Sequence, residues 1–307
     1  MEHEFEEKFK KLKSFMESLP SFSPATQKLI ELSNDLNASP KDVVKAVRMD
    51  PVLTGRVFEL VNSAFFGLPE KVTSLNRVVV YIGINTVKNI ALSASVNGAI
   101  KTNNKKLEEQ VRPLWKHCLA MAVCCKAIAK EIGVSKKKYE EYFIAGLLHD
   151  LGKIILVQCF FETLPHDGVM SCAEEEERYG INHNNVAYEI LKKWNFTDEL
   201  MIPIKNSHNP SANNQMANVI HLADYMTYKL ELNDFDETPD EEDDESSKVK
   251  EEATEELELT EQKVISDYIP TLNDSVWKAL ETDMTKIENC LINAKEEIQK
   301  AELFLKA

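Results

Sequence analysis

The stretch GLLHDLGKIIL, residues 146–156, is the most informative part of this chain because it places three polar side chains in an apolar run. His149, Asp150 and Lys153 stand where Leu, Ile or Val would be buried at lower cost. An unpaired buried charge costs several kcal/mol. These side chains are therefore expected to be paired, to bind a metal, or to line a solvent-filled site.

The composition around this stretch favours an all-α fold. The chain has 307 residues, of which 43% are hydrophobic, and it contains only 9 Gly and 11 Pro. Apolar residues recur at three- and four-residue spacing in nearly every segment, which is the helical period. The length allows one large hydrophobic core or two modest ones, so we expect one or two domains.

The polar segment 101–106, KTNNKK, divides the helical pattern into two lobes. We expect a helical lobe over residues 1–105, a second helical lobe over 106–230, an acidic insert over 231–262, and C-terminal helices over 263–307 that pack on the second lobe.

Local signals set the helix boundaries. Ser39 precedes Pro40 and is followed by Asp42, which predicts a capped helix start. Gly180 predicts a helix end, and Asn182 and Asn85 predict helix starts. In the second lobe, the pattern predicts long helices over about 107–132 and 137–160, the latter containing the opening stretch.

Nearly all of the formal charge of −15 lies in one segment. Residues 231–261 hold sixteen acidic residues and two lysines. The segment has too few apolar residues to fold by itself, so we interpret it as a solvated loop. Its charge would repel phosphate backbones and anionic lipid, so we expect no nucleic-acid partner.

The sequence also indicates where the protein acts. The amino terminus lacks the unbroken apolar core of a secretory signal. No run of about 18 uncharged apolar residues is present, so we predict no membrane span and no membrane partner. The six cysteines form no CxxC pair and mostly stand in apolar helical contexts, as reduced thiols do. We therefore expect a cytoplasmic protein.

The second lobe carries a set of histidines and aspartates that can bind metal. A single buried histidine is usually a hydrogen-bonded core residue, but the whole set is harder to explain that way. Imidazole nitrogen suits Fe, Mn, Zn or Ni, and one carboxylate can bridge two cations. We expect one or two divalent ions, bound by His117, His149, Asp150, His183, His208 and Asp224.

Other polar residues near this set have less certain roles. Lys153 lies one turn after His149, where its ammonium could meet a phosphate oxygen, or could lie on a solvent-exposed helix face. His221 is expected to serve in packing. His166, in the segment LPHDG, is expected in a turn and not in a metal site. The acids 174–177 are expected to form a solvated helix start, although one of them could approach a metal from the edge.

The ordered motifs of the chain resemble those of the HDOD domains, output domains related to the HD metal-dependent phosphohydrolases. The resemblance spans about residues 19–228 and includes DPVLTGRVFELVNSAFFG, LWKHCLAMA, AGLLHDLGKIIL, YGINHNNVAYEILKKWNF and HLADY. It implies an all-α fold with an HD-like second lobe. It also implies a bacterial signalling protein, here a standalone regulatory or scaffold protein whose partner is another signalling protein.

The resemblance also implies roles for individual residues. The ordered H, HD, D metal set of the HD superfamily falls on His117, His149-Asp150 and Asp224. The related HD-GYP phosphodiesterases add a Lys and further histidines for a second ion, which fall on Lys153, His183 and His208. This chain departs from the HD-GYP pattern in two places: Ser207-His208 stands where those enzymes have two histidines, and the following NPSANNQ contains no GYP motif.

Three functions remain open from the sequence. The first is a non-catalytic signalling module that keeps a metal-binding cluster. The second is a metal-dependent phosphohydrolase acting on a nucleotide or cyclic dinucleotide, in which Asp150 bridges two ions and Lys153 neutralises charge on a phosphate. The third is a purely structural cluster of histidines.

Overall fold

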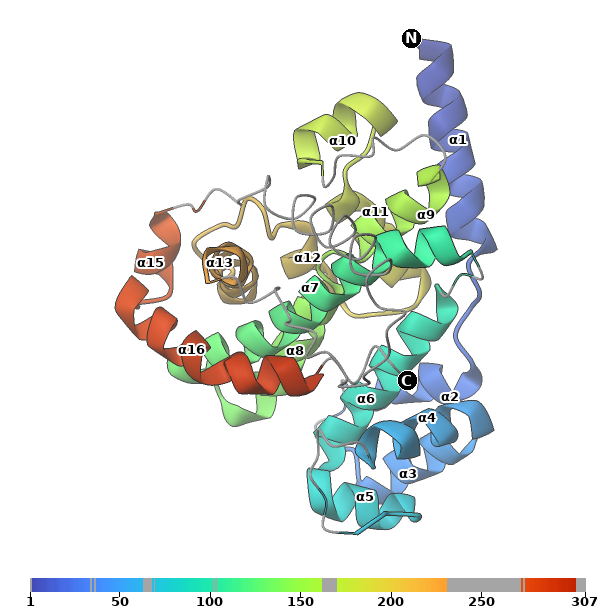
Figure 1. Ribbon diagram of the computed structural model, residues 1–307, viewed down its shortest axis with the longest axis vertical. Coiled ribbons are helices and arrows are strands. Elements are labelled where there is room, and N and C mark those ends of the chain that lie inside the picture. The colour runs from blue at the N-terminus through green and yellow to red at the C-terminus, as the bar shows by residue number, and fades with distance from the viewer. Residues whose placement is uncertain are drawn as a thin grey trace, which may run out of the picture.

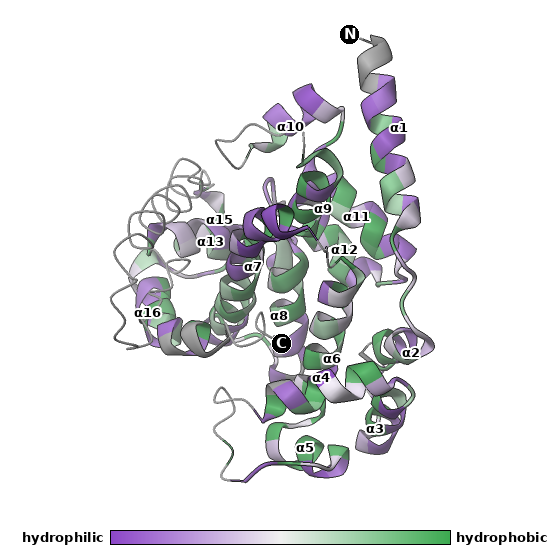
Figure 2. Ribbon diagram, turned by 45° about the vertical axis from the view of Figure 1, so that its right-hand side comes forward, coloured by the Kyte–Doolittle hydropathy of each residue, from purple (hydrophilic) through white to green (hydrophobic). Residues whose placement is uncertain are grey.

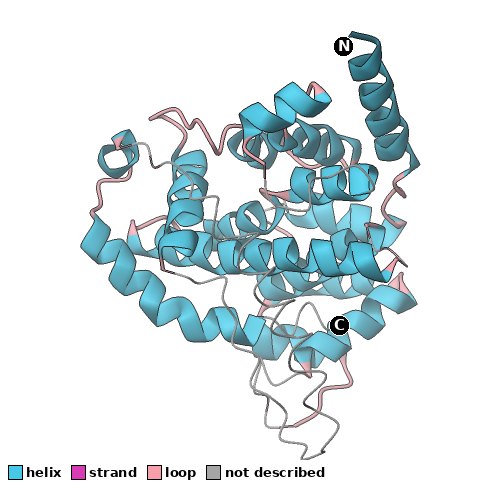
Figure 3. Ribbon diagram, turned by 45° about the horizontal axis from the view of Figure 1, so that its top comes forward, coloured by secondary structure: helices cyan, strands magenta, loops and turns pink. Residues whose placement is uncertain are grey.

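The computed structural model describes residues 2–33, 37–62, 70–100, 104–161, 170–230 and 274–301, together with positions 35, 68, 102 and 272. Within these residues the regular structure is helical, with no strand (Figure 3). The predicted all-α class is confirmed. The predicted acidic insert and the segment containing His166 lie outside the described residues.

The first lobe consists of short helices in the lower right of Figure 1. They are α2 (Pro24–Ser33), α3 (Pro40–Arg48), α4 (Pro51–Val61), α5 (Leu75–Ile82) and α6 (Ile84–Ala99). Ser39 caps α3, and Ser39 and Asp42 form the reciprocal hydrogen bonds of a capping box. The prediction that Asn85 starts a helix is wrong. Gly83, with φ of 84°, makes the turn between α5 and α6, so α6 begins at Ile84.

The second lobe is built around one long helix. Its helices are α7 (Lys105–Glu131), α8 (Tyr139–Leu148), α9 (Leu151–Phe160), α10 (Cys172–Tyr179), α11 (His183–Lys193), α12 (Asp198–Lys205) and α13 (Gln215–Lys229), with a short 3-10 turn, Lys136–Lys138, before α8. Helix α7 confirms the predicted long helix to within two residues at each end, and it contacts α8, α9, α13 and the C-terminal helix.

Two glycines of the opening stretch allow the helices of the second lobe to approach closely. A side chain at Gly146 on α8 would collide with the backbone of Met121 on α7. A side chain at Gly152 on α9 would overlap the carbonyl oxygen of His183 on α11. Because neither position has a Cβ, α7 and α11 can lie close to His149 and Asp150.

The prediction of one continuous helix over 137–160 is wrong. The chain forms α8 and α9, with a break at His149 and Asp150. Asp150 leaves the helical region, with φ of −101° and ψ of 15°, and takes the cap position of α9. Both helices are mostly hydrophobic (Figure 2) and buried, so a side chain at the break points into the protein interior.

By length and composition alone, the stretch from Tyr139 to Phe160 could cross a membrane. However, 83% of its apolar 18-residue segment is buried inside the molecule. A core helix has these properties too, so the finding is weak support for a span. The absence of a span stays a prediction.

Helices at the two ends of the chain lie against the second lobe. Helix α1 (Glu2–Ser18) contacts α9 and α10, at the upper right of Figure 1. Helix α15 (Ser275–Ala279) contacts α13, and α16 (Met284–Ala301) lies along α7.

The end of α1 and the residues that follow it are attached to the far end of α11. The Lys193 ammonium donates to the carbonyl oxygens of Met16, Glu17 and Leu19, at 2.8 to 2.9 Å. The neighbouring Trp194 stacks on Phe22, with ring centroids 4.5 Å apart. These contacts join the start of the first lobe to the helix that begins with His183.

Candidate metal centre

The six predicted metal ligands meet in one buried cluster, although they come from five separate parts of the chain. His117 lies on α7, His149 and Asp150 lie at the α8–α9 break, and Asp224 lies on α13. His183 is the first residue of α11, and His208 follows α12. Five of the six are between 0% and 3% exposed, and His208 is partly buried. The expected convergence is therefore observed, whereas metal binding stays a prediction.

His117, His149, Asp150 and Asp224 form what we call the inner group. The Nε2 atom of His117 lies 3.3 Å from Nε2 of His149 and 3.3 Å from Oδ1 of Asp224. Asp150 lies beside both histidines, with Oδ2 3.7 Å from His117 Nε2 and Oδ1 3.4 Å from His149 Nε2. Such separations are close to those of donor atoms sharing one ion, about 3 to 4 Å for bonds of about 2.0 to 2.3 Å.

Cys172, His183 and His208 form what we call the outer group. The Nε2 atoms of His183 and His208 are 2.8 Å apart, and the Cys172 sulfur lies 3.9 and 4.0 Å from the two ring nitrogens of His183. Asp150 connects the two groups, because its Oδ1 lies 3.6 Å from His183 Nε2. One carboxylate thus faces both sets of imidazoles, as a bridging ligand would.

Two buried carboxylate oxygens in the cluster lack a hydrogen-bond donor. They are Oδ1 of Asp150 and Oδ1 of Asp224, and the two side chains are 1% and 4% exposed. Buried carboxylate oxygens are normally satisfied, because losing water without a replacement is costly. A cation between these oxygens and the histidine nitrogens would satisfy both, so the residues present fit a divalent metal.

Hydrogen bonds outside the cluster orient the histidine rings. His149 Nδ1 donates to the Gly146 carbonyl at 2.8 Å, and His183 Nδ1 donates to Glu175 Oε2 at 2.6 Å. A carbonyl can only accept, so Nδ1 of His149 carries the proton and its Nε2 lone pair faces Asp150. Metal-binding histidines commonly use such partners to fix the ring and its tautomer.

The protonation of the inner group suits ligands for a cation. Burial lowers the pKa of His149. Burial opposes ionisation of Asp224, but the neighbouring His117 and His149 outweigh it and hold that pKa below its ordinary value. Neutral imidazoles and ionised carboxylates are the forms that bind metal.

In the outer group, burial together with the charge of His183 lowers the pKa of His208 to about 3. Burial also acts to lower the His183 pKa, but the Glu175 carboxylate raises it to about 9, so an ion there would displace a proton from His183.

Lys153 is buried and not on a solvent-exposed helix face. Its ammonium donates to Asp150 Oδ2 at 2.8 Å, and the residue is 4% exposed. Burial acts to lower the Lys153 pKa, but the Asp150 carboxylate raises it well above its ordinary value. The ammonium is therefore a fixed positive charge against one face of the cluster.

Other residues at the site were missed or only partly foreseen by sequence reasoning. Glu175 is buried in contact with His183, whereas its neighbours Glu174, Glu176 and Glu177 are exposed as expected. His221 does more than pack, because its Nδ1 donates to the Ser207 carbonyl at 2.8 Å, next to His208. The participation of Cys172 was not foreseen.

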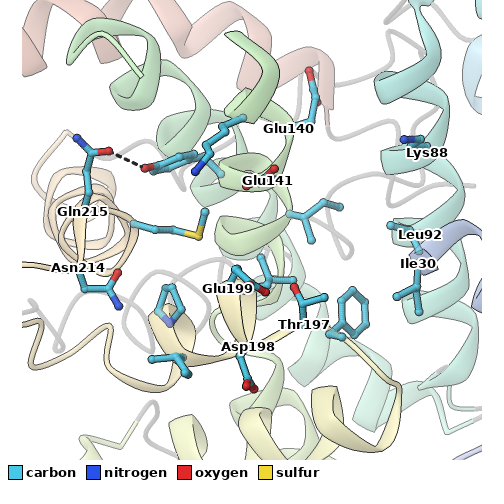
Figure 4. A pocket seen from close by; sticks show the side chains of 18 of the residues that line it. Ile30, Lys88, Leu92, Glu140, Glu141, Thr197, Asp198, Glu199, Asn214 and Gln215 are labelled. Atoms are coloured by element: carbon cyan, nitrogen blue, oxygen red, sulfur yellow. Dashed lines mark hydrogen bonds between the residues drawn. The ribbon is translucent and has the colours of Figure 1, made fainter. Parts of the chain in front are cut away.

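A separate cleft lies between the two lobes (Figure 4). Its volume is about 930 Å³, and it is lined by α6 and Ile30 on one side and by α8, α12 and the start of α13 on the other. Four acidic residues, Glu140, Glu141, Asp198 and Glu199, are among its lining residues. None of the six predicted metal ligands lines it.

The all-helical fold and the buried histidine–aspartate cluster define a protein of the HD-related class. The chain belongs to the HDOD family, whose domain matches residues 19–210. The matched residues include every predicted ligand except Asp224, which lies beyond them on α13.

Solved structures share the fold. A candidate signal transduction protein from Marinobacter aquaeolei VT8 has a TM-score of 0.68 at 20% identity, over 98% of this chain and 66% of the other. A candidate phosphohydrolase from Shewanella amazonensis SB2B has a TM-score of 0.64 at 20% identity, over 96% and 98% of the two chains.

The chain is also similar in sequence to an uncharacterised protein of Treponema pallidum (strain Nichols). The two are 23% identical over 206 residues, which are 62% of this chain and 37% of the relative.

Proposed function

We propose that this chain is an HDOD signalling output module that binds one or two divalent metal ions in its histidine–aspartate cluster without turning over a substrate. The observation that carries the metal-binding part is that two buried carboxylate oxygens, Oδ1 of Asp150 and Oδ1 of Asp224, lack a hydrogen-bond donor. The similarity in fold to a candidate signal transduction protein agrees with the signalling part.

Burial of the cluster favours a module without turnover. The five most buried ligands and Lys153 are all 0% to 4% exposed, so a phosphate group has little surface to approach. The Lys153 ammonium, which would otherwise contact a phosphate, is bound to Asp150. The 930 Å³ cleft between the lobes is lined by other residues, and we assign it to partner recognition.

The proposal includes a protein partner and a cytoplasmic location, with no nucleic-acid or membrane ligand. All six cysteines are free, four of them buried and two half-buried, which suits a reducing compartment. The acidic composition is unfavourable for phosphate backbones and anionic lipid.

Element analysis after purification without chelators tests the proposal. We expect a divalent metal in the wild-type protein and none in a variant carrying His149→Ala and Asp150→Ala. Glu31→Ala is the control, because Glu31 belongs to an exposed pair with Lys28 on α2. A metal-free wild-type protein, or equal metal content in the double variant, would contradict metal binding by the cluster. The histidines and aspartates would then have a structural role only.

A metal-dependent phosphohydrolase is the second candidate, favoured by the position of Asp150 between the inner and outer groups. A bound metal would supply Lewis-acid activation of water and of a phosphoryl oxygen. Asp150 would hold the two groups together, and Lys153 would place positive charge beside the phosphate. Hydrolysis of a cyclic dinucleotide by the metal-loaded protein, lost in Lys153→Ala, would establish this function over the first.

A further inference from the structure

The outer group contains a sulfur donor that the H, HD, D motif does not include. The ligand atoms of Cys172, His183 and His208 all lie within 4.8 Å of one another. The sulfur is 4.0 Å from Nε2 of His183, and this nitrogen is 2.8 Å from Nε2 of His208. A thiol and two imidazoles therefore surround one point at the edge of the buried cluster.

Helix α10 holds the thiol in this position. Ser171 and Glu174 form a capping box that fixes the first turn, in which Cys172 is the first helical residue. Cys172, Glu175 and Tyr179 lie three and four residues apart, so they share one face of α10. Glu175 binds both the backbone N–H and Nδ1 of His183, at 2.7 and 2.6 Å. The face that carries the thiol is thus anchored on the first residue of α11.

A fourth donor faces the same point. Oδ1 of Asp150 is buried, lacks a hydrogen-bond donor, and lies 3.6 Å from Nε2 of His183. One sulfur, two nitrogens and one oxygen make a four-member donor set. Donors on one tetrahedral zinc ion lie about 3.3 to 3.7 Å apart, given bonds of about 2.0 to 2.3 Å. The separations from His183 Nε2 to sulfur and to oxygen are close to this range, whereas the two imidazoles would have to separate slightly.

We propose that Cys172 is a thiolate ligand of the outer group, together with His183, His208 and Asp150. The inference rests on the proposed metal binding and adds an ion preference to it. A thiolate favours Zn²⁺ or Co²⁺ over Mg²⁺ or Mn²⁺, because the harder ions prefer oxygen ligands. When the ion binds, the thiol proton and the proton shared between Nε2 of His183 and Nε2 of His208 pass to solvent, and lone pairs on the sulfur and on the two nitrogens form the bonds to the metal.

Titration of the chelator-stripped full-length chain with Co²⁺ tests the assignment. We expect the wild-type protein to show the near-ultraviolet sulfur-to-cobalt charge-transfer band beside the visible ligand-field bands. Cys172→Ser should lose the sulfur band and bind the outer ion at least about 10-fold more weakly. Cys290→Ser is the matched control, because Cys290 is also half-buried but lies on α16. This control should keep the sulfur band.

Zinc-edge X-ray absorption of the wild-type protein provides a test that needs no variant. One sulfur neighbour of zinc supports the assignment, and a shell of nitrogen and oxygen alone overturns it. Cys118, a buried thiol next to His117 on α7, is the alternative sulfur donor. A sulfur band that survives in Cys172→Ser but is lost in Cys118→Ser also overturns the assignment. Co²⁺ binding without any sulfur band overturns the role of Cys172 and leaves the proposed function standing. A wild-type protein that binds no Co²⁺ or Zn²⁺ overturns both.

Discussion

The inner and outer groups of the cluster use the same imidazole chemistry on different supports. The inner histidines and Asp224 are buried along α7, α8 and α13, and α8 and α13 both pack on the long helix α7. The outer donors lie at the ends of shorter elements: Cys172 and His183 begin helices, and His208 follows one. The inner group is therefore held by helix packing, whereas the outer group depends on caps and single hydrogen bonds. Asp150, which faces both groups, is where the difference can be tested first.

Replacing Asp150 should have the largest effect, because it removes the carboxylate shared by both groups and the hydrogen bond that the buried Lys153 ammonium donates to it. We expect Asp150→Ala to destabilise the metal-free protein by about 3 to 5 kcal/mol and to abolish binding in both groups. Urea denaturation in the presence of chelator measures the first effect, and element analysis measures the second.

The exposed pair Lys28–Glu31 has the same three-residue spacing and serves as the control. Removing Glu31 should leave the urea midpoint unchanged, because exposed ion pairs contribute little. Equal urea midpoints for Asp150→Ala and the wild type would show that the contact between Asp150 and Lys153 does not stabilise the fold.

Replacing one histidine in each group should separate the two ions. His117→Ala is expected to remove the inner ion, and His208→Ala the outer ion, each lowering the metal-to-protein ratio by one where two ions bind. Isothermal titration of the stripped protein with Zn²⁺ gives the number of sites and the affinity of each. Loss of both ions in either variant would mean that the groups form a single site.

Glu175→Gln should weaken only the outer group. The carboxylate accepts from Nδ1 of His183, and hydrogen-bond partners of metal-binding histidines typically contribute about 10- to 100-fold in metal affinity. We expect a loss in this range for the outer ion in the same titration. Glu177→Gln, on the exposed side of α10, should change the affinity far less. An inner ion that weakens equally would contradict the separation of the groups.

The smallest expected effect comes from the helix caps. Asn182 accepts from the Asn185 N–H at the start of α11, and Asn214 accepts from the Ala217 N–H at the start of α13, both at 3.0 Å. Replacing either by Ala should cost about 1 kcal/mol of stability. Only Asn182→Ala should also weaken the outer ion, because His183 is in the first turn of α11 while Asp224 is deep in α13. Urea denaturation and Zn²⁺ titration measure the two effects.

Sequence reasoning predicted the helical class from the apolar period. It also predicted that all six histidine and aspartate residues of the cluster belong to one site, and the resemblance to HD domains implied the ordered set that forms the inner group. Helix α7 could be placed from its apolar period, and α11 from Gly180 and Asn182. The break between α8 and α9 could not be found this way, since apolar residues continue through both helices and Asp150 is the only departure from helical backbone.

His183 and His208 of the outer group were expected as ligands, but the position of Cys172 beside them could not be predicted, because it depends on tertiary packing. Nothing in the spacing of Cys172 and His183, eleven residues apart, shows that α10 turns back onto α11. The contact of Gly152 with the His183 backbone is likewise visible only once the helices are packed. One feature of the sequence could have predicted the burial of Glu175: it lies on the same helix face as Cys172 and Tyr179.

Helix α11 also links the candidate metal centre to the amino terminus. Its first residue is His183, and its last, Lys193, donates to the carbonyl oxygens of Met16 and Glu17 at the end of α1 and of Leu19 just after it. At 1.5 Å per residue, the helix is a rod about 16 Å long. A protein that binds α1 and displaces it would thus also displace α11, and with it the His183 imidazole at the other end of that helix. The NMR signal of the His183 ring would then shift when the partner binds.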